Sequence, residues 1–580
     1  MMYHTLIGGL KMATVDTHNI SLIHLDGATD YKSMNDTTYH DLGLDELAKR
    51  VTEEPKEQQM IQRTLSQMTA SPEAAALRQD IFYDLLTLPD IRKKLLDLMN
   101  RIEYLRDYGS WRKSSDEKAD IWDLLHRLDE INSYIIAVEE LRECLSDPRI
   151  KSEGLSNLKK YVDELYTDSC FEELKQDTAG LKTDTASIQS VTVGINVNSR
   201  FEAESLGLVS VNAKQFKKSG IVGNFADAIA AKDRIKEDSE WDGDMHYVQA
   251  DQSSIDGFIN KMDQNVTALN MMSNPLLMSK ATLSHIPSGD GSVNSTLLLA
   301  NAASKMCGHV VKKLRSVLEK YTDVSIATIS RLIPELIYYI RFAEFIEKET
   351  SRGMHFCKPS VISGKDDSAM NAEGLYNIKL LTAVGKEDEI VYNDLVFDKD
   401  HVIYLLTGAN RGGKTTLTQA VGQLFALAQG GIFVPASSFS YTPVDMIYTH
   451  FPADEDKTFD LGRLGEECVR FRKIFDEATS ESLILLNETF STTSFEEGYY
   501  IATDAVRALI SKNVRTIFNT HMHKLAQDTK ELGSGIASIV MQSIDGQRSF
   551  KVIEMPPEGM SYAHDIAAKY GVTYEMLTGD

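Results

Sequence analysis

The residues of this chain that most clearly imply chemistry form the pattern G-x-x-x-x-G-K-[ST], in which x is any residue. The pattern is made by Gly408, Ala409, Asn410, Arg411, Gly412, Gly413, Lys414 and Thr415. In such a loop, backbone N–H groups surround phosphate oxygens and the glycines let the chain approach them closely. Lys414 would reach the β- and γ-phosphates, and the Thr415 hydroxyl would hold Mg²⁺.

The flanking sequence indicates the elements that would position this loop. Val402–Leu406 is a continuous apolar run that predicts a buried strand, and Leu417–Leu427 has the pattern of a helix. Strand, glycine-rich loop and helix N-terminus are the parts that nucleotide binding needs. A chance match in a glycine-rich turn is the alternative, and the flanking pattern argues against it. We therefore expect the chain to bind ATP or GTP.

Two further predicted strands end in polar residues with suitable chemistry. Leu483–Leu486 is followed by Asn487 and Glu488. Glu488 can position and polarise a water for attack on a γ-phosphate, whereas Asn487 offers an amide at a place suited to a Mg²⁺-binding carboxylate. Val514–Phe518 is followed at a short distance by His521, which could contact the γ-phosphate. A lone histidine would more often be structural, but its position as the third element in this order favours a function.

Composition sets limits on the rest of the chain. Its 580 residues predict two to four domains, and 42% apolar with 25% charged residues is ordinary for a globular protein. The net charge of −24 gives no general attraction to nucleic acid, so DNA binding would need basic residues gathered locally. Five scattered cysteines without a C-x-x-C pair, no apolar run of membrane-spanning length and no secretory signal predict a cytoplasmic or nucleoid-associated protein without a membrane partner.

The pattern divides the chain into three parts. Residues 1–43 show weak periodicity and predict a poorly ordered arm. Residues 44–360 are mostly helical, and residues 361–580 alternate strand and helix signals, which is typical of an α/β nucleotide-binding domain. A representative helical stripe with Pro89 in its first turn is formed by Ile91, Leu95, Leu98, Ile102 and Leu105.

A β-rich insertion interrupts the helical part at about 187–260. Apolar residues alternate with polar ones at Val191, Val193, Ile195 and Val197, and again at Val209 and Val211, which predicts two strands. The basic residues near these strands are Arg200, Lys214, Lys217 and Lys218. A basic β tip on long helices could contact a phosphate backbone, and a solvated hairpin explains the same pattern equally well.

Six segments resemble, in the same order, motifs of the MutS family of DNA mismatch-repair ATPases, which belong to the ABC-type ATPases. They are Gly408–Thr416 (similar to G-P-N-M-G-G-K-S-T), Gln429–Ala436 (Q-x-G-x-F-V-P-A), Asp445–Thr449 (D-x-I-F-T), Asn487–Ser494 (D-E-x-G-R-G-T-S), Phe518–Leu525 (F-A-T-H-Y-H-E-L) and Ser561–Val572 (S-Y-G-I-x-V-A-x-x-A-G-V). Six motifs in the correct order are far more specific than a phosphate-binding loop by itself.

The resemblance implies an ABC-type ATPase domain at 361–580, preceded at 44–360 by a helical core and lever domain. The family's DNA-contacting clamp would map onto the insertion at 187–260. ATP would be bound by residues 408–416, which include Thr416, and by Asn393 near the adenine. The resemblance also implies a homodimer in which the partner subunit completes each ATP site.

The same resemblance implies the roles of the polar residues. Lys414, Glu488 and His521 would be catalytic, and Thr415 and Asn487 would hold Mg²⁺. Asn487 replaces an acidic residue of the family, so we expect weaker Mg²⁺ affinity but retained hydrolysis. Gly462 stands where the family's signature S-T-F-x-x-E has serine, which removes a hydroxyl from the contact between subunits, although Arg463 could supply charge there.

The family's mismatch-reading domain would precede the levers, where the sequence leaves no room for it. We therefore expect a short, divergent branch without that domain, and with a short or absent C-terminal dimer element.

Two functions fit these features. In the first, ATP binding is coupled to clamp-like binding of structured or mismatched DNA, as part of repair or recombination. In the second, the ATPase is a dimerisation switch that acts on a repair or regulatory protein partner without recognising DNA. The charge of −24 and the expected lack of the recognition domain favour the second function, whereas the family resemblance and the basic cluster favour the first. A transporter ATPase fits poorly, because helical levers ahead of the phosphate loop are not its usual arrangement.

Overall fold

The structure is a computed structural model. It describes residues 21–25, 30–108, 121–167, 169–186, 190–197, 199–200, 203–212, 248–249, 308–321, 329, 331–363, 369–383, 390–452, 462–544, 547–557 and 570–578. These residues fall into two compact units, one within 100–140 and 162–330 and the other within 16–99, 141–161 and 331–580. Because both units draw on separate stretches of the chain, the predicted boundaries at 43 and 360 stay predictions.

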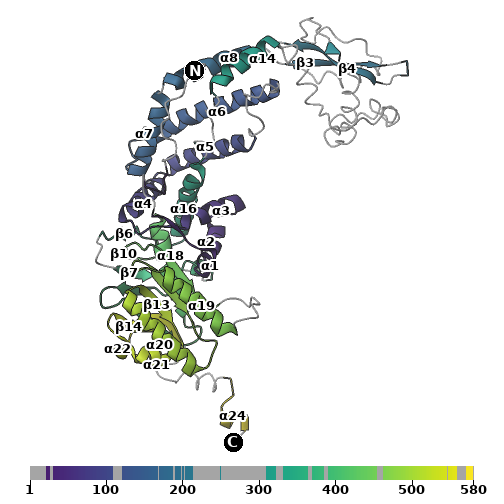
Figure 1. Ribbon diagram of the computed structural model, residues 1–580. Helices are drawn as coiled ribbons and strands as arrows, with labels where there is room; N and C mark the ends of the chain where they lie inside the picture. The colour runs from purple at the N-terminus through teal and green to yellow at the C-terminus, as the bar shows by residue number, and fades with distance from the viewer. Residues whose placement is uncertain are drawn as a thin grey trace, which may run out of the picture. The chain divides into compact units, whose positions relative to one another are not determined.

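A six-stranded sheet forms the centre of the second unit (Figure 1). Its strands, in spatial order, are β11 (Ile447–His450), β12 (Leu483–Asn487), β13 (Arg515–Asn519), β9 (Ile403–Gly408), β14 (Ile536–Ile544) and β15 (Gln547–Glu554). The first five are parallel and β15 is antiparallel to β14. Strands β9, β11, β12 and β13 are buried at every position, which explains their continuous apolar sequences.

The register of this sheet places three strand ends side by side. Asn487 of β12 pairs with Asn519 of β13, and Asn519 pairs with Leu406 of β9. The segments that follow these parallel strands therefore leave the sheet at one edge. The three strands predicted from apolar runs are confirmed, and their carboxyl ends are neighbours, which the sequence order did not reveal.

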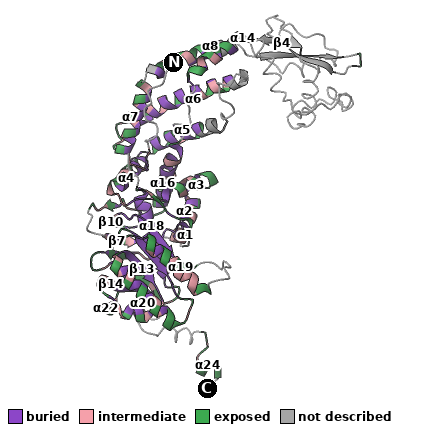
Figure 2. Cartoon of the chain, in the orientation of Figure 1, coloured by how far each residue is buried: buried purple, intermediate pink, exposed green. Residues whose placement is uncertain are grey.

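Helix α18 (Lys414–Gln429) follows β9 and packs on β9, β12 and β13. Figure 2 shows it almost entirely in the buried colour. The predicted helix at 417–427 is thereby confirmed. The other helices among the described residues of this part of the chain are α17 (Leu380–Ala383), α19 (Gly462–Glu477), α20 (Phe495–Lys512), α21 (His523–Gln527), α22 (Thr529–Leu532) and α24 (Tyr574–Thr578).

A second, four-stranded sheet has the order β6 (Ser360–Val361), β10 (Ser438–Tyr441), β7 (Met370–Leu375) and β8 (Asn393–Phe397). Helices α2 (Leu44–Val51), α3 (Pro55–Leu65), α4 (Pro72–Thr87) and α16 (Ile333–Ser351) belong to the same unit, and α16 packs against the other three. Arg78 of α4 joins these helices to the end of α18. Its fully buried guanidinium donates to the carbonyl oxygens of Ile23 (2.8 Å), Gln67 (3.0 Å) and Gln429 (2.8 Å).

Part of the predicted N-terminal arm has regular structure. Strand β1 (Lys32–Ser33) pairs with β2 (Gln67–Met68), and α1 (Asp36–Asp41) packs on β11. The Asn35 side chain caps α1 by accepting from the Thr38 N–H, and Leu42 is fully buried. Elements this short contain too few apolar positions to produce a periodic pattern, so the sequence did not indicate them.

Helices α5 (Pro89–Tyr108), α6 (Ile121–Leu145) and α7 (Glu153–Thr167) contribute residues to both units. The predicted helix with Pro89 at its start is confirmed, and Ile91, Leu95, Leu98 and Ile102 are buried. The first unit also contains α8 (Ser169–Ala186), α14 (Gly308–Leu318) and the 3₁₀ turn η2 (Glu319–Tyr321).

The β-rich insertion contains a three-stranded antiparallel sheet of β3 (Ser190–Val197), β4 (Ala203–Asn212) and β5 (Val248–Gln249). This confirms the two predicted strands. The basic residues Lys214, Lys217 and Lys218 lie outside the described residues. Within the described ranges, no helix is long and apolar enough to cross a membrane.

Candidate nucleotide-binding site

The glycine-rich loop connects the end of β9 to the start of α18, and its glycines are needed for different reasons. Gly408 (φ +134°) and Gly413 (φ +97°) have left-handed backbone that favours glycine. At Gly412, a Cβ atom would lie 2.8 Å from the Ala409 carbonyl oxygen, which is backbone and cannot easily move. The pattern of glycines therefore follows from the shape of the loop as well as from the room that a phosphate needs.

Lys414, the first residue of α18, folds its side chain back over this loop. Its buried ammonium donates to the carbonyl oxygens of Gly408 (3.0 Å) and Ala409 (3.3 Å). Burial lowers the pKa of Lys414, and the charge of Glu488 opposes that shift. A cation held among neutral carbonyls in this way would gain from an anionic phosphate placed beside it.

Thr415 meets the end of β12. Its hydroxyl donates to Asn487 Oδ1 at 3.1 Å, so the two predicted Mg²⁺ ligands lie together. The amide oxygen and the hydroxyl oxygen are hard ligands of the type that Mg²⁺ prefers, and Mg²⁺ usually keeps several waters besides one or two protein ligands. The donor set therefore fits the metal, although it lacks the charge of a carboxylate at position 487.

Glu488 and His521 lie just beyond the ends of β12 and β13 and contact each other. The distance from His521 Nε2 to Glu488 Oε1 is 2.8 Å, and both side chains are a little over one-third exposed. Glu488 has a left-handed backbone (φ +54°), and its N–H donates to the Asn519 carbonyl oxygen at 2.8 Å. The carboxylate is thus placed at a solvent-accessible edge, beside the ring that would orient it.

Asn393 lies in β8, and both polar atoms of its side chain are hydrogen-bonded to the protein backbone. Its amide Nδ2 donates to the Phe550 carbonyl oxygen (3.0 Å), and its Oδ1 accepts from the Val552 N–H (2.7 Å). These bonds fasten β8 to β15 and leave the side chain buried. A contact of Asn393 with adenine therefore stays a prediction, and it would require this bridge to open.

Phe550 is a residue near the loop that sequence reasoning missed. Its backbone is left-handed (φ +56°), and its side chain is partly exposed. The ring atom Cδ1 lies 3.4 Å from the point where a Cβ on Gly413 would stand. No motif marks Phe550, because only the folding of the β14–β15 hairpin brings it to the loop.

The signature segment begins α19. Gly462 has φ +67°, and apart from its chain neighbours and the backbone of its own helix, no atom of the described residues lies within 4 Å of the position of a Cβ. Glycine, which replaces the serine of the family pattern, is thus suited to the left-handed backbone at the first residue of α19. The described residues leave room for a Cβ atom there, so crowding is not the reason for glycine.

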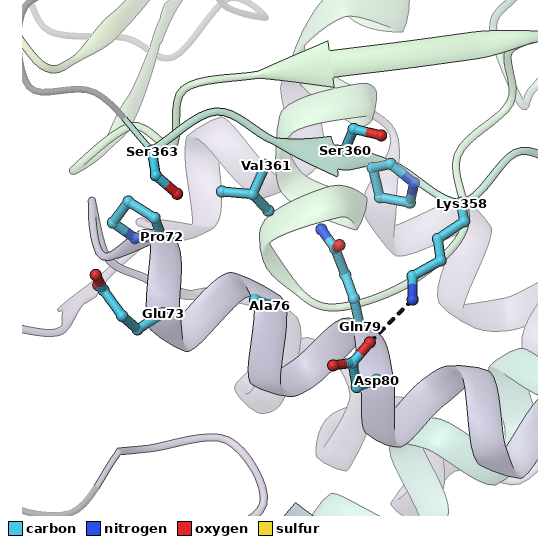
Figure 3. A pocket seen from close by; sticks show the side chains of 10 residues that line it. Pro72, Glu73, Ala76, Gln79, Asp80, Lys358, Ser360, Val361 and Ser363 are labelled. Carbon is cyan, nitrogen blue, oxygen red and sulfur yellow. Dashed lines mark hydrogen bonds and ion pairs between the residues drawn. The ribbon is translucent and has the colours of Figure 1, made fainter. Parts of the chain in front are cut away.

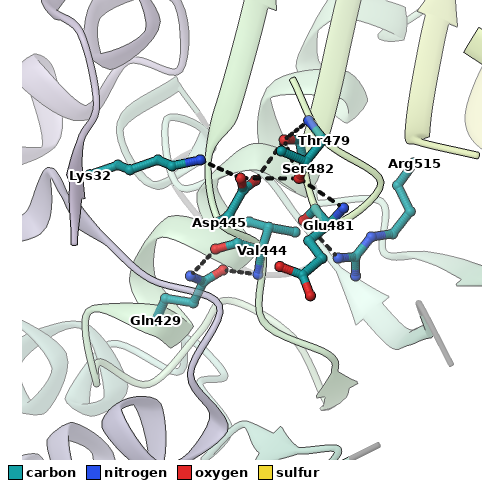
Figure 4. A network of polar contacts seen from close by, with 8 residues as sticks. All are labelled: Lys32, Gln429, Val444, Asp445, Thr479, Glu481, Ser482 and Arg515. Atoms are coloured by element: carbon teal, nitrogen blue, oxygen red, sulfur yellow. Dashed lines mark hydrogen bonds and ion pairs between the residues drawn. The ribbon is translucent and has the colours of Figure 1, made fainter. Parts of the chain in front are cut away.

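Asp445 and Gln429, which belong to two of the motifs, support the sheet at the amino ends of its strands, opposite to the carboxyl ends that carry the candidate site (Figure 4). Asp445 accepts hydrogen bonds from the hydroxyls of Ser482 (2.6 Å) and Thr479 (3.1 Å) just before β12. Gln429 bonds the Val444 backbone through both its amide oxygen (2.9 Å) and its amide nitrogen (2.8 Å). These residues position strands at their amino ends, away from the polar residues at the carboxyl ends.

A cleft elsewhere in the same unit contains none of the predicted site residues (Figure 3). It lies between α4 and the segment around β6. An ion pair of Lys358 Nζ with Asp80 Oδ1, 2.9 Å long, crosses it. The candidate site is therefore the loop at the sheet edge, which brings together Lys414, Thr415, Asn487, Glu488 and His521.

Comparison with known families agrees with this assignment. The family model of MutS domain V matches residues 404–572, which include the glycine-rich loop and the ends of β12 and β13. The model of the MutS2 N-terminal domain matches residues 70–349. The chain belongs to the MutS family.

Individual relatives show how far the similarity extends. The DNA mismatch repair protein MutS of Clostridium perfringens is 28% identical over 326 residues, which are 52% of this chain and 35% of the relative. MutS of Clostridium novyi is 33% identical over 192 residues, 32% of this chain and 21% of the relative. Endonuclease MutS2 of Thermus thermophilus is 29% identical over 190 residues, 33% of this chain and 25% of the relative. The chain spans about a third or less of the length of these relatives.

Proposed function

We propose that this chain binds ATP with Mg²⁺ at the glycine-rich loop and hydrolyses it. The observation that carries the proposal is the convergence of the chemically suited residues at one edge of the sheet. Lys414 folds back over the loop that would hold the phosphates, and Thr415 lies against Asn487. Glu488 lies against His521 on the neighbouring strand ends.

Each residue has a defined task in this proposal. Mg²⁺, when bound, would neutralise charge on the β- and γ-phosphates. The buried Lys414 ammonium would leave the loop carbonyls for phosphate oxygens. Glu488 would orient and polarise the attacking water and accept its proton, while His521 would hold the carboxylate and contact the γ-phosphate.

The proposal extends to coupling between ATP and structured or mismatched DNA. Support comes from the match of residues 70–349 to the MutS2 N-terminal domain and from relatives named for DNA mismatch repair. The three-stranded sheet of the insertion lies within that match and is our candidate for the DNA clamp. If ATP and DNA favour the same conformation, each increases the affinity for the other by the same factor.

We further propose that two copies of the chain complete each other's ATP site, with the start of α19 as the contributing segment. A variant that binds ATP without hydrolysing it would then dimerise in ATP. Light scattering with and without ATP tests this, and a monomer in both conditions would refute it.

The main experiment measures ATPase rate with homoduplex, mismatched duplex and four-way junction DNA at two salt concentrations. We expect the rate to change selectively with a mismatched or branched DNA, and less at high salt because phosphate contacts release counterions. No nucleotide binding would refute the ATPase proposal. Hydrolysis that no DNA affects would refute only the DNA coupling, and would point to a switch that acts on a protein.

A charge-reversal variant locates the DNA contact. Changing Lys214, Lys217 and Lys218 to Glu should weaken DNA binding and reduce its salt dependence. The matched control changes three exposed helix lysines, Lys56, Lys93 and Lys160, to Glu, which alters the net charge equally. Equal loss in both variants would mean a general charge effect and would contradict a contact at the insertion.

A further inference from the structure

Asn519 is the last residue of β13 and lies between the two strand ends that carry the site. It pairs with Asn487 of β12 on one side and with Leu406 of β9 on the other. The side chain is fully buried. The chain departs from the family motifs quoted above at both positions, with Asn487 in place of aspartate and Asn519 in place of alanine. These two departures are direct neighbours in the sheet.

The two asparagine side chains are hydrogen-bonded. Asn519 Nδ2 donates to Asn487 Oδ1, the same oxygen that accepts from the Thr415 hydroxyl. An amide has one oxygen and one nitrogen end of nearly equal shape, so rotating Asn487 by half a turn would direct its NH₂ group at Thr415. The Asn519 donor opposes that rotation. A carboxylate at position 487 would need no such partner, because either of its ends is an oxygen.

The second polar atom of Asn519 has different surroundings. Its Oδ1 is buried, and no described residue gives it a hydrogen bond. Buried polar atoms are almost always paired, and an unpaired one in a native fold marks a place where a further donor is expected. The unpaired oxygen therefore belongs to a residue that pairs directly with Asn487, which in turn accepts from Thr415.

We propose that Asn519 is a positioning residue for the Mg²⁺ site, and that it orients Asn487 so that an oxygen faces the cation beside Thr415. Its own Oδ1 would accept a hydrogen bond from a further donor bound at this site. Asparagine at position 487, unlike aspartate, can direct either an oxygen or a nitrogen at Thr415. Asparagine at position 519 thereby selects the orientation in which the oxygen faces Thr415. This inference rests on the proposed ATP and Mg²⁺ binding.

The test is a double-mutant cycle read by nucleotide binding and not by turnover. Fluorescent ATP analogue is titrated with Mg²⁺ in the wild type, Asn519→Ala, Asn487→Asp and the double variant. In the Asn487 background, Asn519→Ala should raise the Mg²⁺ concentration for half-maximal binding about fivefold, an effect of the size that one hydrogen bond carries. In the Asn487→Asp background, the same change should have an effect smaller than about twofold, because orientation no longer matters.

A purely structural role for Asn519 predicts a different result. The melting temperature would then fall in both backgrounds, and the Mg²⁺ midpoint would shift in neither or equally in both, which would overturn the proposal.

Asn371→Ala, at an exposed position in β7 of the other sheet, is the matched control and should change nothing. Alanine stands at position 519 in the family motif, so the variant should fold. If it does not, Asn519→Leu keeps the length and branching of the side chain, removes the donor and carries the same expectation.

Failure of the inference can be told apart from failure of the proposed function. If the wild type does not bind the ATP analogue, or binds it without regard to Mg²⁺, the proposed function fails. If the wild type shows a Mg²⁺-dependent midpoint that Asn519→Ala leaves unchanged, the proposed function stands and the role of Asn519 is refuted.

Discussion

The substitution Glu488→Gln is expected to abolish most hydrolysis while leaving folding and ATP binding intact. Glutamine has the shape of glutamate and keeps an oxygen that can accept a hydrogen bond from His521, 2.8 Å from the carboxylate in the wild type. It has no charge with which to accept a proton from water. The change therefore removes the general base without removing the side chain that fills the position.

The expected loss of stability in Glu488→Gln is much smaller than the expected loss of hydrolysis rate. Glu488 and His521 are both more than one-third exposed, and even an ion pair so well solvated would contribute only about 0.2–1 kcal/mol to stability. The left-handed backbone at Glu488 costs the same with either side chain. Loss of general-base catalysis, by contrast, lowers the rate about 10²- to 10⁴-fold.

Single-turnover hydrolysis with excess protein measures the chemical step, and urea unfolding measures stability. Glu531→Gln, an exposed carboxylate on α22, is the matched control. His521→Gln should also slow hydrolysis, and the double variant should lose less than the product of the two single losses because the residues act together. If Glu488→Gln hydrolyses ATP at the rate of the control, Glu488 is not the base. A loss of several kcal/mol of stability would show instead that its role is structural.

Three further outcomes are expected. Asn487→Asp adds a negative charge beside Thr415 and should lower the Mg²⁺ midpoint for nucleotide binding roughly tenfold, and an unchanged midpoint would contradict the role of Asn487. Arg78→Met leaves two buried carbonyl oxygens and one partly buried carbonyl oxygen without this donor and should lower the free energy of unfolding by about 3–5 kcal/mol in urea titrations, whereas a loss below about 1 kcal/mol would contradict that account. Burial, with a smaller effect of Arg470, lowers the pKa of His450 from 6.5 to about 4. The unfolded chain therefore binds more protons between these values, so stability should fall as pH drops from 6.5 to 4, and the dependence should be weaker in His450→Gln.

The sequence predicted those parts of the site that lie in continuous segments. Apolar runs followed by Asn487, Glu488 and His521 marked the strand ends, because parallel strands buried on both faces must be apolar throughout. The glycine pattern marked the loop. In these segments the structural elements and the polar residues follow one another directly in the sequence, so a local pattern is enough to predict them.

Features that depend on which strands become neighbours were not predictable. The pairing of Asn519 with Asn487 follows from the order β12-β13-β9, which no local pattern encodes. The bridge from Asn393 to β15 and the approach of Phe550 to Gly413 depend on the fold in the same way. Gly462 was interpreted as a lost hydroxyl, and its left-handed backbone provides a second physical reason for the residue type.

Helix α18 has firm attachments at both ends. Lys414 lies at its first turn, and at its last turn the Gln429 carbonyl oxygen accepts from Arg78 while the Gly430 carbonyl oxygen accepts from the Tyr338 hydroxyl at 2.9 Å. Sixteen residues of helix span about 24 Å. No loop interrupts this span, so a movement of the helix at the phosphate end would be passed to α4 and α16 as the displacement of a rigid rod.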